Sequence, residues 1–205
     1  MKPQIGVVPE YDAALLCAHL SDDLKQDGIY LEQCSDFEKI ERFAADIKKP
    51  GILPILSPSD NDFFETNCFW LLASAYEKNG DPEQTGRPVG MIGMRRDQSG
   101  RESLKSYSER KLRTLFPTEA NVAIRPDRLP SFADDIRGDI VYMGDLYFSS
   151  ERRSALVKRE NMRKFATIAY SLIYLKWTDL DWLYAFLRDR DVRRGATWML
   201  SLIHI

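Results

Sequence analysis

One segment of the 205-residue sequence, residues 139–173, constrains the fold more than any other. Its first ten residues read DIVYMGDLYF, and such an apolar and aromatic run predicts a buried β-strand. A polar turn follows at 149–154, and from Asn161 onward apolar residues recur at helical spacing. The sequence therefore predicts a strand that runs through a short turn into a long amphipathic helix.

Periodicity and turn chemistry predict the remaining elements. Ser35 or Asp36 can cap a helix, because its side-chain oxygen accepts a hydrogen bond from an unpaired backbone N–H. Residues 77–87 contain Asn-Gly and Asp-Pro pairs, so the apolar runs on either side predict a β-hairpin with a long polar loop. The other predicted strands cover 28–34, 67–76, 88–95 and 181–187, and the other predicted helices cover 11–24, 37–47, 103–115 and 192–199.

Composition excludes several classes of protein. Lys and Arg number 29 and Asp and Glu 31, a balance that argues against a dedicated nucleic-acid binder. The sequence has no run of about 18 apolar residues that could span a membrane, and its N-terminus lacks the apolar stretch of a secretory signal. We therefore expect a cytoplasmic protein whose residues 1–205 form one domain.

Cysteine and histidine are too few and too dispersed to predict a metal site. Cys17, Cys34 and Cys68 are widely spaced, which is typical of free thiols in a reducing compartment. The only histidines are His19 and His204, far apart in the sequence. We expect no metal.

A basic cluster coincides with the turn between the long strand and the long helix. Residues 151–164 carry six bases and two acids. A helix start presents unpaired N–H groups and a partial positive charge, which together bind phosphate. Arg152, Arg153 and Lys158 could add charge-assisted hydrogen bonds to a pyrophosphate. The alternative interpretation is a solvated basic helix start.

The order of these elements resembles the GNAT acyltransferase superfamily over roughly residues 28–199. Residues 146–154, LYFSSERRS, look like the central strand of the family running into its cofactor turn. Residues 183–186 and 191–196 look like its fifth strand and the helix that follows. The resemblance implies an α/β (α+β) fold, with a GNAT-like mixed, mostly antiparallel central sheet flanked by helices and with shortened C-terminal strands. Residues 1–27 would be an N-terminal extension and residues 97–138 an insertion.

The same resemblance implies the position of each strand in the sheet. The strand at 139–148 is expected to be central, with the hairpin on one side and the strand at 181–187 on the other. The strand at 181–187 should splay from it at one end, where the pantetheine arm of the cofactor would enter. The insertion at 97–138 would lie beside the acceptor, as a lid or a specificity loop.

The activity implied by the resemblance is the transfer of an acyl group to an amine. The co-substrate would be acetyl-CoA or another acyl-CoA. The residues implied for binding it are Phe148, Arg152, Arg153, Ser154, Ala155 and Lys158. Asp145 is the carboxylate that we expect to take the amine proton, with Tyr142 and Tyr147 as alternatives. Because side chains alternate along a strand, Asp145 should share a face with Met143 and Tyr147 and oppose Tyr142.

Departures from the family pattern keep a second function open. Small and apolar residues replace the glycines of the cofactor turn, and residues 197–199 offer no tyrosine to protonate the leaving thiolate. These features favour a non-catalytic GNAT-like binding or scaffold module. The partners that we expect are a small-molecule amine or an acyl carrier protein, which the basic clusters at 95–113 and 151–164 would face. A homodimer could form through the apolar residues 200–205.

Overall fold

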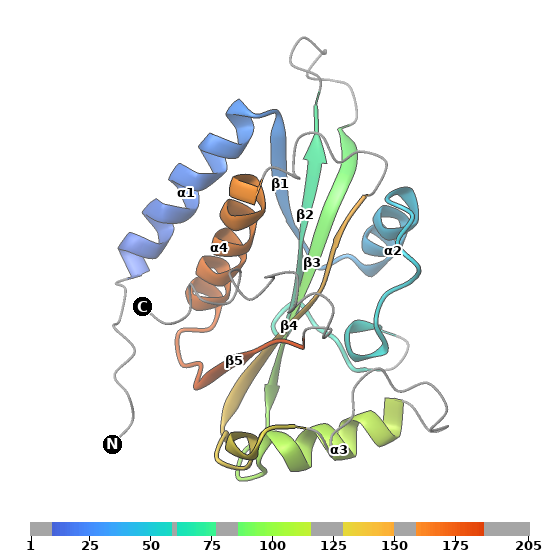
Figure 1. Ribbon diagram of the computed structural model, residues 1–205, viewed down its shortest axis with the longest axis vertical. Coiled ribbons are helices and arrows are strands. Elements are labelled where there is room, and N and C mark those ends of the chain that lie inside the picture. Colours follow the sequence, from blue (N-terminus) through green and yellow to red (C-terminus); the bar gives the residue numbers. More distant parts are fainter. Residues whose placement is uncertain (1–9, 59–60, 77–85, 116–128, 150–158, 187–205) are drawn as a thin grey trace.

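The centre of the molecule is a five-stranded mixed sheet with helices on both faces (Figure 1). The computed structural model describes residues 10–58, 61–76, 86–115, 129–149 and 159–186. The strand order is β1-β2-β3-β4-β5, and every neighbouring pair is antiparallel except β4 and β5, which are parallel. The strands are β1 (Ile29–Cys34), β2 (Cys68–Ala75), β3 (Arg87–Gln98), β4 (Asp139–Phe148) and β5 (Trp182–Tyr184).

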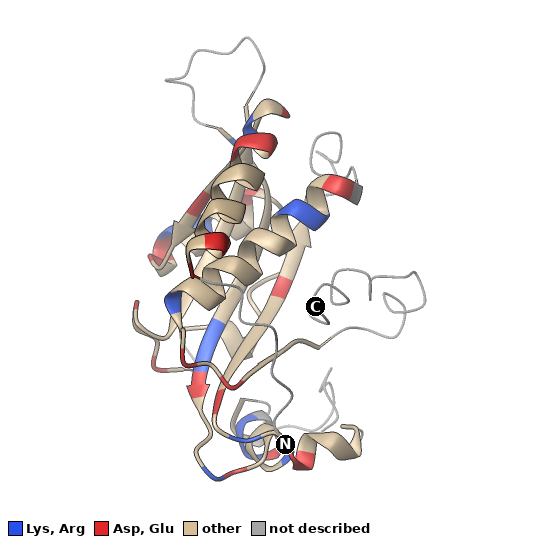
Figure 2. Cartoon of the chain, turned by 90° about the vertical axis from the view of Figure 1, so that its left-hand side faces the viewer, with Lys and Arg blue, Asp and Glu red and all other residues tan. Residues whose placement is uncertain are grey.

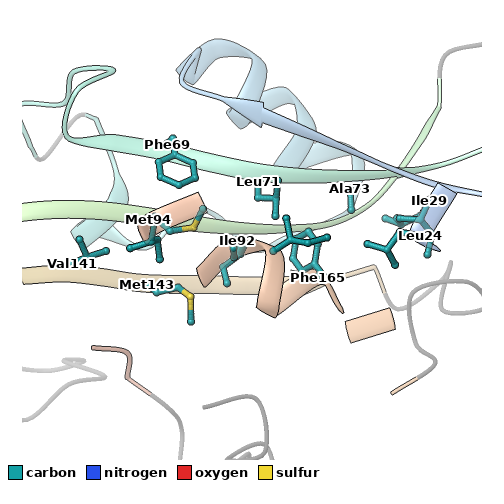
Figure 3. Close-up of a cluster of buried hydrophobic side chains, with 14 of the residues drawn as sticks. Leu24, Ile29, Phe69, Leu71, Ala73, Ile92, Met94, Val141, Met143 and Phe165 are labelled. Carbon is teal, nitrogen blue, oxygen red and sulfur yellow. The ribbon is translucent and has the colours of Figure 1, made fainter. Parts of the chain in front are cut away.

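One face of the sheet packs against α1 (Glu10–Gln26) and α4 (Arg159–Lys176). Alternate strand residues and the apolar side of α4 meet there in a layer of buried side chains (Figure 3). Burying such side chains stabilises the fold by about 1.5–3 kcal/mol each. The fully buried members of this layer include Leu24, Ile29, Phe69, Ala73, Met94, Val141, Phe165 and Ala169.

The opposite face packs against α2 (Phe37–Asp46) and the short 3-10 helix η1 (Pro54–Leu56). The Asp36 side chain caps α2 by accepting a hydrogen bond from the backbone N of Lys39 at 3.1 Å, which selects one of the two caps that the sequence allows. Ile40 and Phe43 then project from α2 into a second layer, which includes Trp70 and Tyr142 from the sheet.

The described ends of the insertion at 97–138 are anchored at the end of the β3–β4 pair. They form α3 (Leu104–Leu115) and the 3-10 helix η4 (Ser131–Asp134). The backbone N of Leu104 donates to the carbonyl of Ile136 at 2.8 Å, and both side chains pack with Tyr107 and Ile140. Tyr184 of β5 contacts the same cluster. The role of the insertion as a lid or specificity loop stays a prediction.

The predicted α/β fold is confirmed. The strand at 139–148 is β4, with the hairpin strands on one side and β5 on the other. The strand predicted at 181–187 has ladder pairs only over residues 182–184. The helix predicted at 192–199 and the tail at 200–205 lie outside the described residues. The single domain over 1–205 stays a prediction. No helix in the described part of the chain is long and apolar enough to cross a membrane.

Candidate functional site

The parallel strands β4 and β5 are paired over only three residues. Ile140 pairs with Trp182, and the last pair is Tyr142 with Tyr184. Beyond that pair, β4 continues to Phe148 beside β3, and no described residue forms a ladder pair with its other edge. β5 itself ends at Tyr184, so the predicted splay between the two strands stays a prediction. The end of the ladder leaves backbone groups of residues 143–148 along one open edge of β4.

A β-bulge interrupts β4 within this open stretch. Gly93 opposes Gly144, whereas Met91 opposes Tyr147, so three steps along β4 match two steps along β3. Asp145 has a φ of 57°, in the left-handed region that side chains other than glycine rarely adopt. A bulge locally disrupts the ladder and re-aims the side chains that follow it.

The bulge reverses the alternation of side chains along β4. Met143 before it and Leu146 after it both face α1 and α4, although their positions differ by an odd number. Tyr142 and Tyr147 both face α2, and Asp145 contacts the segment that follows α2. The expectation that Asp145 shares a face with Met143 and opposes Tyr142 is therefore wrong, because it assumed a regular strand.

Asp145 is tied to the loop between α2 and η1. Its Oδ1 lies 2.8 Å from the Nζ of Lys49, and its Oδ2 accepts a hydrogen bond from the backbone N of Leu53 at 2.9 Å. The side chains of Lys49 and Asp145 are each only 5% exposed. Lys49 also donates to the carbonyl of Gly51. Both carboxylate oxygens of Asp145 therefore accept hydrogen bonds from within the protein.

The two tyrosines of β4 differ in their surroundings. The Tyr147 hydroxyl donates to the carbonyl of Lys48 at 3.0 Å, which adds another contact between β4 and the same loop. Tyr142 is buried, and its ring centroid lies 5.3 Å from that of Tyr184. Its hydroxyl lies over Gly144, where a Cβ would collide with it. Burial and the negative charge of Asp145 raise the pKa of Tyr142, so its hydroxyl stays protonated at neutral pH.

A second buried polar group lies on the same face of the sheet, around Arg95. The guanidinium of Arg95 contacts Asp97 Oδ2 at 2.5 Å, the Tyr107 hydroxyl at 2.6 Å and Asn61 Oδ1 at 3.1 Å. It also donates to the carbonyl of Ile55. These contacts join β3, α3 and the segment around η1 into one unit. Such a unit can hold α3 in a fixed position beside the sheet.

The basic cluster at 95–113 is largely paired with acids in the described structure. Arg96 contacts Asp139 and Asp179, and Lys105 and Arg110 each contact an acidic side chain as well. Figure 2 shows acidic and basic residues interspersed over the described elements seen from the α1 and α4 side. An acyl carrier protein as the partner stays a prediction. The excess of bases over acids in residues 95–113 suggested such an acidic partner, but within the described structure several of those bases already pair with acids of the same chain.

The predicted cofactor turn lies mostly outside the described residues. Those positions are Arg152, Arg153, Ser154, Ala155 and Lys158. Phe148 is described, and its ring meets that of Phe165 edge-on with centroids 5.8 Å apart. Its contact with a cofactor stays a prediction. In the described part of the chain, no group of three or more His, Cys, Asp or Glu residues is placed to hold a metal ion.

Sequence reasoning missed the partners of Asp145. Lys49 and Leu53 belong to a distant segment, between α2 and η1, and no local pattern there indicates a contact with β4. The bulge did leave a signal, because a glycine inside a strand pattern indicates a bulge, and Gly144 directly precedes Asp145.

Comparison with known proteins adds little to this description. No family model matches the sequence, and no curated protein matches it. A solved structure of a GCN5-related N-acetyltransferase from Ralstonia eutropha JMP134 matches at 12% identity, covering 92% of this chain and 86% of that chain, with a TM-score of 0.32.

Proposed function

We propose that the chain is an N-acyltransferase that moves an acyl group from acyl-CoA to an amine. The observation that supports this proposal most is the open edge of β4, where the strand leaves β5 and bulges at Gly144 and Asp145. A thioester along this edge could place its carbonyl oxygen against a backbone N–H of β4. Such a donor stabilises the negative charge that develops on the oxygen during transfer.

The basic residues after β4 support a site for the phosphates of the acyl donor in this proposal. The basic turn that follows β4 would supply backbone N–H groups together with Arg152, Arg153 and Lys158. In this proposal the acyl-CoA enters from the turn, and its pantetheine arm runs between β4 and β5. The amine then approaches from the end of the sheet where α3 lies (Figure 1).

Proton removal from the amine is the least supported step. Asp145 as the general base stays a prediction, and its contacts with Lys49 and Leu53 work against it, since both oxygens are engaged. The same contacts favour the second candidate function, a binding module without catalysis. An ordered water could take the proton in its place.

Calorimetric titration with acetyl-CoA and with free CoA at low salt tests the donor site. The variant Arg152→Glu/Arg153→Glu should lose binding, because two phosphate partners become repulsive. The matched control is Arg42→Glu/Arg101→Glu, which makes the same charge change at two exposed positions, on α2 and in the loop before α3. The control should bind like the unmodified protein.

Catalysis is tested by following thiol release from acetyl-CoA across a panel of amines. Binding accompanied by amine-dependent thiol release supports the acyltransferase. Binding without thiol release for any amine supports the binding module. No heat and no thermal shift at millimolar acetyl-CoA would contradict the proposal, because a ligand that binds only the folded state raises its stability.

A further inference from the structure

The bulge of β4 is held by a neighbouring segment of strained backbone. Lys48 has a φ of 55° and Asp145 a φ of 57°, and both lie in the left-handed region. The two strained sites are joined directly, because Lys49 pairs with Asp145 and the carbonyl of Lys48 accepts from Tyr147. Strained backbone persists only where the surrounding contacts determine it, and it gathers at functional sites.

The ion pair between Lys49 and Asp145 is unusual for its depth. Each side chain is 5% exposed, whereas Lys39 and Glu32, another pair on this side of the sheet, are 43% and 53% exposed. A buried ion pair gives little net stability, because desolvation offsets the attraction, but removing one partner leaves an uncompensated charge. Such a pair therefore fixes a geometry more than it stabilises the fold.

We propose that Lys49 and Asp145 act together as a positioning pair that sets the bulge of β4. The pair fixes the backbone at Asp145, and so decides which N–H groups of β4 point along its open edge. This inference rests on the proposed function, in which those N–H groups orient the acyl carbonyl. Asp145 then affects the transfer only by fixing the conformation of its own backbone. Lys49 affects it only by holding the carboxylate of Asp145.

The positioning role and the general-base role predict different results in a double-mutant cycle. The variants are Lys49→Met, Asp145→Asn and the two combined. Asparagine tolerates the left-handed region, so Asp145→Asn removes the charge without forcing the backbone to move. Methionine keeps much of the length of Lys49 without its charge.

A positioning pair predicts that each single variant lowers kcat/KM by about 10²-fold, as a misplacement of about 1 Å does. The double variant should lose no more than the worse single variant, and the pH profile should keep its shape. A general base predicts instead that Asp145→Asn lowers kcat by up to about 10⁴-fold, that Lys49→Met costs far less, and that the profile loses its acid limb. That second pattern overturns the inference.

Backbone amide exchange tests the inference even if the chain proves to have no acyltransferase activity. Lys49→Met should speed exchange and shift the amide resonances of Gly144 through Tyr147. Lys49→Arg should keep the exchange rates and resonances of the unmodified protein, because a guanidinium can pair with the same carboxylate. Lys39→Met, which removes the exposed ion pair between α2 and Glu32 of β1, should leave the exchange rates and resonances of residues 144–147 unchanged. Unchanged amides at residues 144–147 in both Lys49→Met and Asp145→Asn overturn the inference. If Lys49→Met does not fold, Asp145→Asn decides between the same two outcomes, with Lys49→Arg as the control that keeps the pair.

Discussion

Where the sheet meets α1 and α4, its side chains form an apolar layer; where it meets α2 and η1, they share the space with charged groups. Arg95, Lys49 and Asp145 are the three most deeply buried members of the ion pairs in the described structure, and all three lie on the α2 side. The α1 and α4 side is built instead from residues such as Phe69, Met94 and Phe165 (Figure 3).

The difference separates two tasks within one sheet. An apolar layer gains stability from the area removed from water and tolerates changes that keep its volume. Buried charges give little net stability, yet they specify positions through directional contacts. The α2 side therefore adds to its own apolar layer directional contacts that fix the geometry of the candidate site, whereas the α1 and α4 side contributes mainly through apolar burial.

The largest effect is expected on the apolar side. Phe165→Ala should destabilise the protein by about 3–5 kcal/mol, because the side chain is fully buried between α4 and the sheet. The control is Leu15→Ala on α1, where the side chain is 51% exposed and the change should stay within about 0.5 kcal/mol. Urea denaturation of both variants measures the difference. Equal losses would show that the apolar layer does not carry the stability.

A smaller loss is expected from Arg95→Lys on the α2 side. Lysine cannot reproduce the guanidinium fork, so contacts with Ile55, Asn61 or Tyr107 would be lost, at a cost of about 2–3 kcal/mol. Tyr107→Phe removes only one hydroxyl and should cost about half as much. Denaturation of the two single variants and the double variant gives their coupling. Strict additivity would contradict the description of these residues as one unit.

Gly93→Ala should lower the free energy of unfolding by a still smaller amount, about 1–2 kcal/mol, because the added methyl group overpacks the site. A Cβ at Gly93 would lie 2.8 Å from Cζ2 of Trp70 and 2.9 Å from Cδ1 of Leu56. Trp70 fluorescence should shift along with stability, because the indole lies directly against that position. A variant as stable as the parent, with unchanged fluorescence, would mean that the layer above β3 is looser than described.

The reactivity of the Cys17 and Cys68 thiols tests their burial in the unmodified protein. Burial raises the pKa of Cys68 to about 12, so at pH 8 its thiol should resist a disulfide reagent until the protein unfolds. Cys17, which is only half-buried, should react first.

Because the folded pKa of Cys68 exceeds the unfolded value of about 8.5, its contribution to stability is complete below pH 8.5 and is lost as the pH rises toward 12. Replacing Cys68 with alanine should remove that part of the alkaline loss.

The sequence predicted those features that depend on local pattern. The cap at Asp36, one of two candidates, and the apolar side of α4 follow from spacing and turn chemistry, and the structure confirms both. The central place of β4 was implied by the family resemblance, and the strand order confirms it. The orientation of Asp145 was wrong because one extra residue in a strand exchanges its two faces, and periodicity assumes a regular strand.

Long-range contacts could not be predicted in the same way. Leu53 and Asp145 lie 92 positions apart, and no local spacing connects them. The burial of Arg95 also opposes the usual exposure of arginine, so composition placed it on a basic surface. Both misses fall on the α2 side, where position depends on pairing between distant segments.

Amide resonances followed during titration with acetyl-CoA show whether the open edge of β4 binds the acyl donor. We expect the largest shifts at Gly144 through Phe148, with β1 and the outer surface of α1 unchanged. Lys49→Met should weaken or displace those shifts. Shifts confined to α1 and β1, or none at millimolar acetyl-CoA, would rule out binding of the donor at β4.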